Sequence, residues 1–93
     1  MKQLIDKTKA ANPHPIVRET VQKIVSSIRT ENTETIEVNR EVFNEIARIT
    51  GNQIQKTWSW YWMSFFDDNY ETRVDIQYRD YLGDIAKPLN TEQ

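Results

Sequence analysis

The sequence predicts an α+β domain with two N-terminal helices, a short strand, a third helix and a C-terminal aromatic antiparallel β-hairpin. Three observations support this prediction. Apolar residues recur at helical spacing between positions 17 and 28, and residues 70–79 alternate between apolar or neutral and polar or charged side chains. In addition, six of the nine residues 58–66 are aromatic, and aromatic side chains favour strands.

The length and composition of the chain indicate one domain over residues 1–93. Hydrophobic residues make up 38% and charged residues 28%, which is typical of a globular protein. The apolar runs are too short to span a membrane, and the N-terminus lacks the apolar core of a signal peptide. Because the chain also has no cysteine, we expect a cytoplasmic protein. Residues 87–93 are expected to form a flexible tail, after a last contact through Ile85.

The N-terminal third predicts two helices separated by a proline-rich joint. Residues 1–14 form an arm or short helix that ends before Pro13, because a residue preceding proline avoids the helical conformation. Pro15 suits the first turn of the second helix, where its missing N–H costs nothing. The second helix presents a single apolar stripe, formed by Val17, Val21, Ile24, Val25 and Ile28.

The middle of the chain predicts a short strand followed by a capped helix. Residues 35–38 alternate and include β-branched side chains, as in a strand. Asn39 is a good N-cap for the next helix, and Gly51 supplies the left-handed residue that ends it. The buried face of this helix is expected to consist of Val42, Phe43, Ile46, Ala47 and Ile49.

The aromatic segment 58–66 and the alternating segment 70–79 predict the two strands of a hairpin. Residues 67–69, Asp-Asp-Asn, are typical of a turn, and Asn69 tolerates the left-handed conformation that a three-residue loop requires. Such a loop pairs Trp62 with Val74.

The predicted register gives the hairpin two different faces. The first face, which packs on the helices, gathers Trp58, Trp60, Trp62 and Phe66. The second face holds Tyr61, Met63 and Phe65 among charged neighbours, which is more typical of an interface than of a core. We therefore predict a partner-binding patch centred on these three residues, with Trp60 and Arg73 as further contact residues. The alternative is that all these aromatic side chains belong to the core.

The first half of the aromatic segment also fits a helix, which would precede a strand. In that arrangement Ala47-x-x-x-Gly51 resembles the helix-turn-helix of small phage and bacterial regulators, in which an alanine packs between two helices and a glycine forms the turn. The resemblance covers about residues 39–60 and implies a winged helix-turn-helix fold that binds DNA. Five polar residues of the second helix would then face the DNA: Asn52, Gln53, Gln55, Lys56 and Ser59. The acidic C-terminal third argues against this alternative, because DNA-binding domains more often present a basic face.

No motif for catalysis, metal binding or cofactor binding stands out. His14 is the only histidine and lies between two prolines. Asp67, Asn69 and Glu71 have the spacing of the first calcium-loop ligands, but the glycine and the glutamate of such a loop are missing. We therefore expect no cofactor, no metal, no small-molecule substrate and no enzymatic activity.

The function that these observations predict is non-catalytic binding of a macromolecule. Aromatic and methionine side chains dominate the cores of protein interfaces. Small size and surplus aromatic residues fit an inhibitor or adaptor of a larger protein assembly, of the kind that phages and other mobile elements encode. The partner is expected to be another protein or a second copy of this chain. A DNA-binding transcriptional regulator is the alternative.

Overall fold

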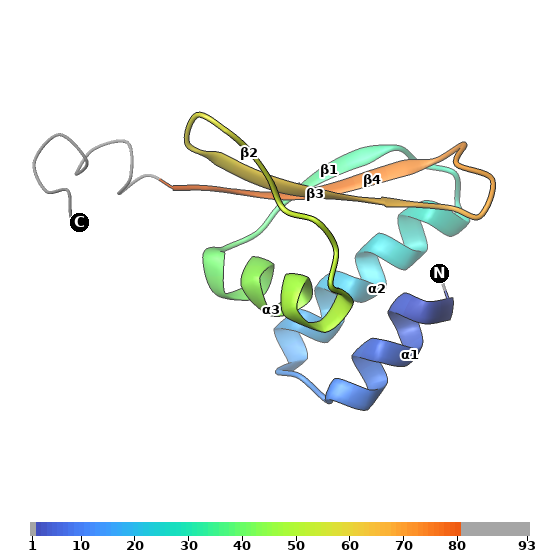
Figure 1. Ribbon diagram of the computed structural model, residues 1–93. Coiled ribbons are helices and arrows are strands. Elements are labelled where there is room, and N and C mark those ends of the chain that lie inside the picture. Colours follow the sequence, from blue (N-terminus) through green and yellow to red (C-terminus); the bar gives the residue numbers. More distant parts are fainter. Residues whose placement is uncertain (1, 81–93) are drawn as a thin grey trace, which may run out of the picture.

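The computed structural model describes residues 2–80 and places its three helices on one side of a four-stranded sheet (Figure 1). The predicted α+β class is confirmed. None of the described helices has the length and apolar character needed to cross a membrane. The described elements are, in chain order, α1 (Lys2–Ala11), α2 (Pro15–Arg29), β1 (Glu34–Glu37), α3 (Arg40–Thr50), β2 (Gln55–Thr57), β3 (Trp60–Phe66) and β4 (Arg73–Arg79).

The helix ends form where local signals in the sequence predict them. Pro15 begins α2, and the preceding His14 accepts a hydrogen bond from the backbone N–H of Ile16 at 3.2 Å. Asn39 caps α3, because its side-chain oxygen accepts the N–H of Val42 at 2.8 Å. Gly51 ends α3 with φ 68°, the left-handed conformation that glycine adopts without strain.

The sheet has the strand order β1-β4-β3-β2. The predicted strand over residues 35–38 is present as β1, one residue earlier than expected, and it pairs in parallel with β4. The remaining pairs, β4–β3 and β3–β2, are antiparallel. β2 was not predicted, because its three residues are all exposed and show no alternation. As a result β1 and β2 form the two edges of the sheet.

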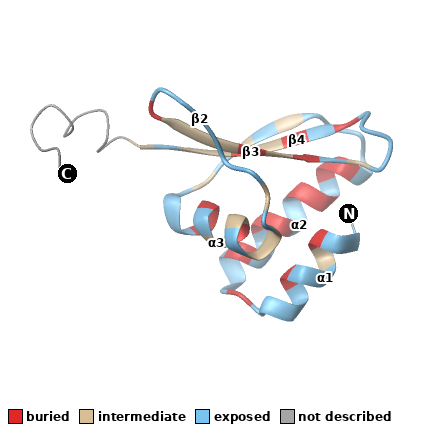
Figure 2. Ribbon diagram, in the orientation of Figure 1, coloured by how far each residue is buried: buried red, intermediate tan, exposed pale blue. Residues whose placement is uncertain are grey.

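The core lies between the helices and the side of the sheet that faces them (Figure 2). Every residue of the predicted stripe on α2 is buried, which confirms that prediction. On α3 the predicted face is buried at Val42, Phe43 and Ile46, while Ala47 and Ile49 pack against the core with partial exposure. The sheet contributes four buried hydrophobic side chains, Met63, Phe65, Val74 and Ile76.

The hairpin forms as predicted, but its register differs. Phe66 pairs with Arg73, so the connecting loop has the six residues 67–72 instead of three. The Asp67 carboxylate explains the longer loop, because it accepts hydrogen bonds from the backbone N–H groups of Glu71 at 2.7 Å and Thr72 at 3.0 Å. The left-handed residue of the loop is Tyr70, with φ 59°, and not Asn69.

The longer loop exchanges the two faces of β3. Val74 was predicted opposite Trp62 but lies opposite Phe65, a shift of three residues. Because side chains alternate along a strand, this odd shift reverses β3 relative to β4. Val74 and Ile76 stay buried on the side of the helices, whereas the side chains of β3 exchange faces. Trp58 leaves the strand altogether and lies in the two-residue turn between β2 and β3. The predicted contact of Ile85 and the tail over residues 87–93 lie outside the described residues.

Candidate protein-binding surface

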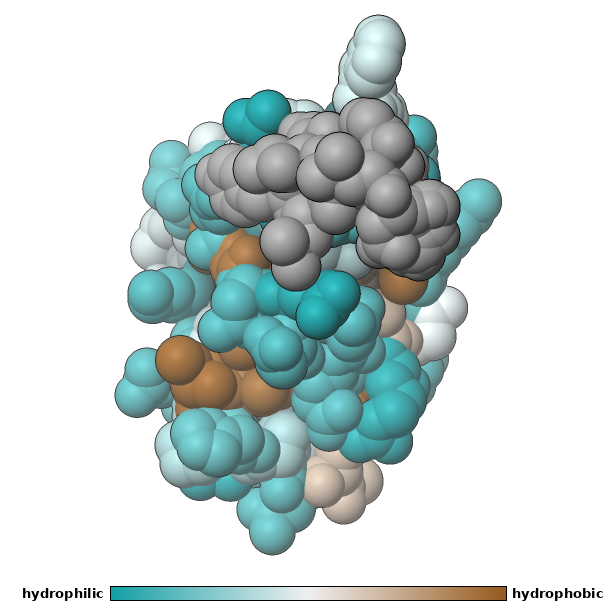
Figure 3. Space-filling model, turned by 90° about the vertical axis from the view of Figure 1, so that its left-hand side faces the viewer, coloured by the Kyte–Doolittle hydropathy of each residue, from teal (hydrophilic) through white to brown (hydrophobic). Residues whose placement is uncertain are grey.

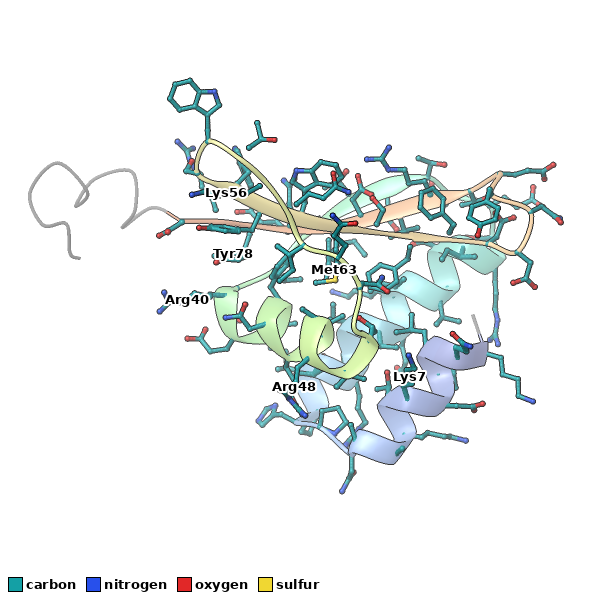
Figure 4. The ribbon with its side chains drawn as sticks, viewed as in Figure 1. Lys7, Arg40, Arg48, Lys56, Met63 and Tyr78 are labelled. Carbon is teal, nitrogen blue, oxygen red and sulfur yellow. The ribbon has the colours of Figure 1, made fainter. Side chains whose placement is uncertain are left out.

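The predicted patch of Tyr61, Met63 and Phe65 is part of the core, so the prediction of an exposed patch is wrong. Met63 is 0% exposed and Phe65 is 6% exposed. Tyr61 is half-buried, and its ring stacks on that of Tyr78 with centroids 4.9 Å apart. Figure 4 shows Met63 and Tyr78 on the side of the sheet that faces the helices. The physical reason is the odd register shift, which turns these residues inward.

The opposite side of β3 and β4, which we call the outer face, carries the tryptophan side chains. All three helices lie on the other side of the sheet, so none of them covers it (Figure 1). On β3, Trp60 and Trp62 are half-buried and Phe66 is 39% exposed. By the alternation of side chains, the outer face consists of Trp60, Trp62, Ser64 and Phe66 from β3 and of Arg73, Asp75, Gln77 and Arg79 from β4.

Two arginines lie over the tryptophan rings. The guanidinium carbon of Arg73 is 5.5 Å from the ring centroid of Trp62, and that of Arg79 is 5.7 Å from that of Trp60. Both distances allow a cation–π attraction of about 0.5–1 kcal/mol at exposed sites. The arginines therefore orient the two indole rings along the outer face.

An ion pair fixes one of these arginines. Arg73 donates hydrogen bonds to both carboxylate oxygens of Asp75, at 2.9 and 3.0 Å, and Ser64 donates to the same carboxylate at 2.6 Å. The hydrogen bond to Asp75, followed by the attraction between the two charges, raises the pKa of Arg73 above its ordinary value. A bidentate arginine–carboxylate pair has a defined geometry. The Trp62 end of the outer face is therefore preorganised.

Further exposed aromatic residues lie at both ends of β3. Tyr70 is 76% exposed, and its ring lies 5.5 Å from that of Phe66. Trp58 is 89% exposed in the turn at the other end of the strand. Its φ of 54° is in the left-handed region, which is unusual for a bulky residue. Trp58 thus has few contacts within the chain and a strained backbone.

Residues 39–60, all of which the structure describes, do not form the second helix that a helix-turn-helix requires, so that interpretation is wrong. After Gly51 the chain enters the extended strand β2, which contains Gln55 and Lys56. Asn52 is half-buried and donates a hydrogen bond to the carbonyl of Ser64 at 3.3 Å, whereas Gln53 is exposed. Ser59 is buried and accepts a hydrogen bond from Arg79 at 3.3 Å. The five residues proposed for DNA contact therefore share no helical face.

Residues that could hold a metal ion do not gather in the described part of the chain. Over residues 2–80, no group of three or more His, Cys, Asp or Glu residues is arranged to hold a metal ion. His14 serves as the N-cap of α2, and Asp67 binds backbone N–H groups of its own loop.

From one end of the molecule (Figure 3) the surface is mostly hydrophilic, with hydrophobic residues in small separate areas.

Of the five predicted contact residues, the structure places Trp60 and Arg73 on the outer face. Sequence reasoning missed Trp62, Phe66 and Arg79, since it turned Trp62 and Phe66 toward the helices. The signal that could have corrected the register is Asp67, a residue whose carboxylate commonly binds nearby backbone N–H groups in loops.

Comparison with protein-family models, with curated proteins and with solved structures finds no match.

Proposed function

We propose that this chain is a non-catalytic module that binds a partner protein through the outer face of its sheet. The observation that carries the proposal is the position of Trp60 and Trp62 on the side of the sheet that no described helix covers. Tryptophan, tyrosine and arginine are the residue types that most often dominate binding energy at protein interfaces. The outer face combines two tryptophans with two arginines, and Tyr70 adds a further exposed ring at its end.

Trp58 extends this surface at the opposite end of β3. An indole that is 89% exposed contributes little packing to the fold, and its φ of 54° carries a conformational cost. Strained residues of this kind are found at sites that contact ligands. Contact between Trp58 and the partner would account for a bulky side chain at a position that suits glycine.

The charges of the outer face favour a protein over a nucleic acid. Arg73 is neutralised by its ion pair with Asp75, and Glu37 of the neighbouring strand β1 lies on the same side of the sheet. A surface that binds a polyanion needs an excess of positive charge. The nearly neutral outer face instead suits a partner surface of mixed polarity.

A small module that binds through one face fits an inhibitor or an adaptor of a larger protein assembly, of the kind that mobile elements encode. The partner is another protein or a second copy of this chain. We place the module in the cytoplasm, because the chain contains no cysteine for disulfide bonds.

The test compares the tagged wild-type chain with the Trp60→Ala/Trp62→Ala variant in cells that naturally produce it. We expect at least one protein to be enriched by the wild type and to be lost by about tenfold or more with the variant. Ile16→Ala is the matched control, because Ile16 is a large hydrophobic residue that is 48% exposed on α2. Sedimentation of the purified chain decides whether that partner is a second copy.

Two results would contradict the proposal. The first is that the tryptophan variant captures the same proteins as the wild type. The second is that nuclease treatment abolishes all capture, since the outer face would then bind nucleic acid by base stacking.

A further inference from the structure

A groove between α1 and α2 forms a second candidate site, distant in sequence from the outer face. The two helices make a hairpin around residues 12–14 (Figure 1), and the groove between them has a volume of about 670 Å³. Its apolar lining comes mainly from the half-buried Ile5 of α1, with smaller contributions from Val21 and Val25 of α2, which are 4% and 7% exposed. No residue of α3 or of the sheet lines it.

The groove has positively charged residues at both ends. Lys9 and Arg18 lie near the helix ends that meet at the hairpin, whereas Arg29 is the last residue of α2. The three cationic side chains line the groove together with neutral residues only. Among the described residues none of the three forms an ion pair with a carboxylate. The charges of this site are therefore available to a ligand.

One of these cations is held in place by the hairpin itself. Arg18 donates a hydrogen bond to the carbonyl of Pro13 at 2.7 Å and another to the side chain of Asn12 at 3.3 Å. The guanidinium group has five N–H donors, so others stay available for a carboxylate. A preorganised cation loses less conformational entropy when it binds.

The helical hairpin is also the basic part of the whole sequence. Residues 2–29 contain six Lys or Arg and two Asp or Glu, whereas residues 31–93 contain six and twelve. The groove thus combines an apolar floor with a basic surrounding. A nucleic acid would be attracted by the positive charges but would not pack on the apolar residues of the groove. An uncharged apolar ligand would pack on the apolar residues but would leave the positive charges without a partner.

We infer that the groove between α1 and α2 binds an acidic amphipathic helix of a partner protein. Arg29 lies eleven positions after Arg18, which corresponds to about 16 Å along α2 and to about three turns of a bound helix. Such a helix packs apolar side chains over Ile5 and over the small exposed parts of Val21 and Val25. Its Asp or Glu residues near each end face the cations. This is the helix-in-groove mode of recognition. It is independent of the outer face and would give the module two binding surfaces.

The experiment uses the full chain and a synthetic helical peptide of about 14 residues, with leucines at i, i+4 and i+7 and glutamates at both ends. In NMR titrations we expect saturable shifts that are confined to amides of α1 and α2. A control peptide with lysines in place of the glutamates should bind at least about tenfold more weakly.

Three charge-reversed variants locate the site. Lys9→Glu and Arg29→Glu should each weaken binding of the acidic peptide by about fivefold to tenfold. Lys23→Glu is the matched control, because Lys23 is an exposed residue of α2 that does not line the groove, and it should change affinity by less than about twofold. All three residues are exposed, so thermal unfolding of the variants should match that of the wild type.

Four outcomes would overturn the inference. They are the absence of saturable peptide binding, shifts centred on the sheet, equal binding of the acidic and basic peptides, and an equal loss of affinity in all three variants. Binding of phosphatidylglycerol vesicles through Lys9 and Arg29, without binding of the peptide, would also overturn it and assign the groove to a membrane surface.

Discussion

Replacement of Trp58 by glycine should stabilise the fold, because this residue is strained and almost fully exposed. Its φ is 54°, and a side chain in the left-handed region costs roughly 1–2 kcal/mol. Glycine removes this cost but adds about 0.5–1 kcal/mol of conformational entropy in the unfolded chain. Since the indole is 89% exposed, little packing is lost. The net expectation is a gain of about 0.5–1 kcal/mol in the free energy of unfolding.

Urea and thermal denaturation measure this gain. For a domain of this size it corresponds to a rise of about 3–6 °C in Tm. Trp58→Ala is the control, because alanine keeps the strain and loses the ring, so its stability should lie within about 0.5 kcal/mol of the wild type. A loss of stability in Trp58→Gly would refute the reasoning, since it would show that the exposed ring or the turn conformation stabilises the fold.

Three further changes test the packing, the loop and the pH dependence. Met63→Ala should lower the free energy of unfolding by about 2–5 kcal/mol, because Met63 is 0% exposed. Trp62→Ala on the outer face should lower it clearly less. Similar losses for the two variants in chemical denaturation would contradict the register. Asp67→Ala should lower the free energy of unfolding by about 1–3 kcal/mol, because two backbone N–H groups lose their hydrogen-bond acceptor. A denaturation experiment that shows no such loss of stability would refute the role of Asp67 in the loop. Burial raises the pKa of Tyr78, so the folded state retains the phenol proton to a higher pH than the unfolded state does. The resulting stabilisation is present below about pH 10 and is lost as the pH rises further. Tyr78→Phe should reduce this alkaline loss in unfolding measurements between pH 9 and about 11. An undiminished loss in this variant would exclude the assignment.

The features that the sequence predicts correctly depend on local signals. The apolar stripe of α2, the Asn39 cap and the Gly51 stop each involve residues within a few positions of one another, so helical geometry determines them. β2 lacks such a signal. It forms because the start of β3 offers a pairing partner, which three exposed residues cannot indicate by themselves.

The register of the hairpin could not be predicted in the same way. A turn-forming Asp-Asp-Asn segment fits loops of three or of six residues, and the choice depends on hydrogen bonds of Asp67 and on which strand face fits the helices. The difference is odd, so one error in loop length placed every side chain of β3 on the wrong face. For this reason Trp60, Trp62 and Phe66 were expected on the side of the helices, although Trp60 and Arg73 were also named as contact residues.

The most direct test of the proposed function is site-specific photo-crosslinking from the outer face. The variant Trp62→p-benzoylphenylalanine keeps an aromatic side chain there, and Glu19→p-benzoylphenylalanine places the same group at an exposed position of α2. In cells that naturally produce the chain, we predict a covalent adduct with one partner protein from position 62 and no such adduct from position 19. The absence of a protein adduct from position 62, or equal yields of the same adduct from both positions, would contradict the assignment of the outer face as the binding surface.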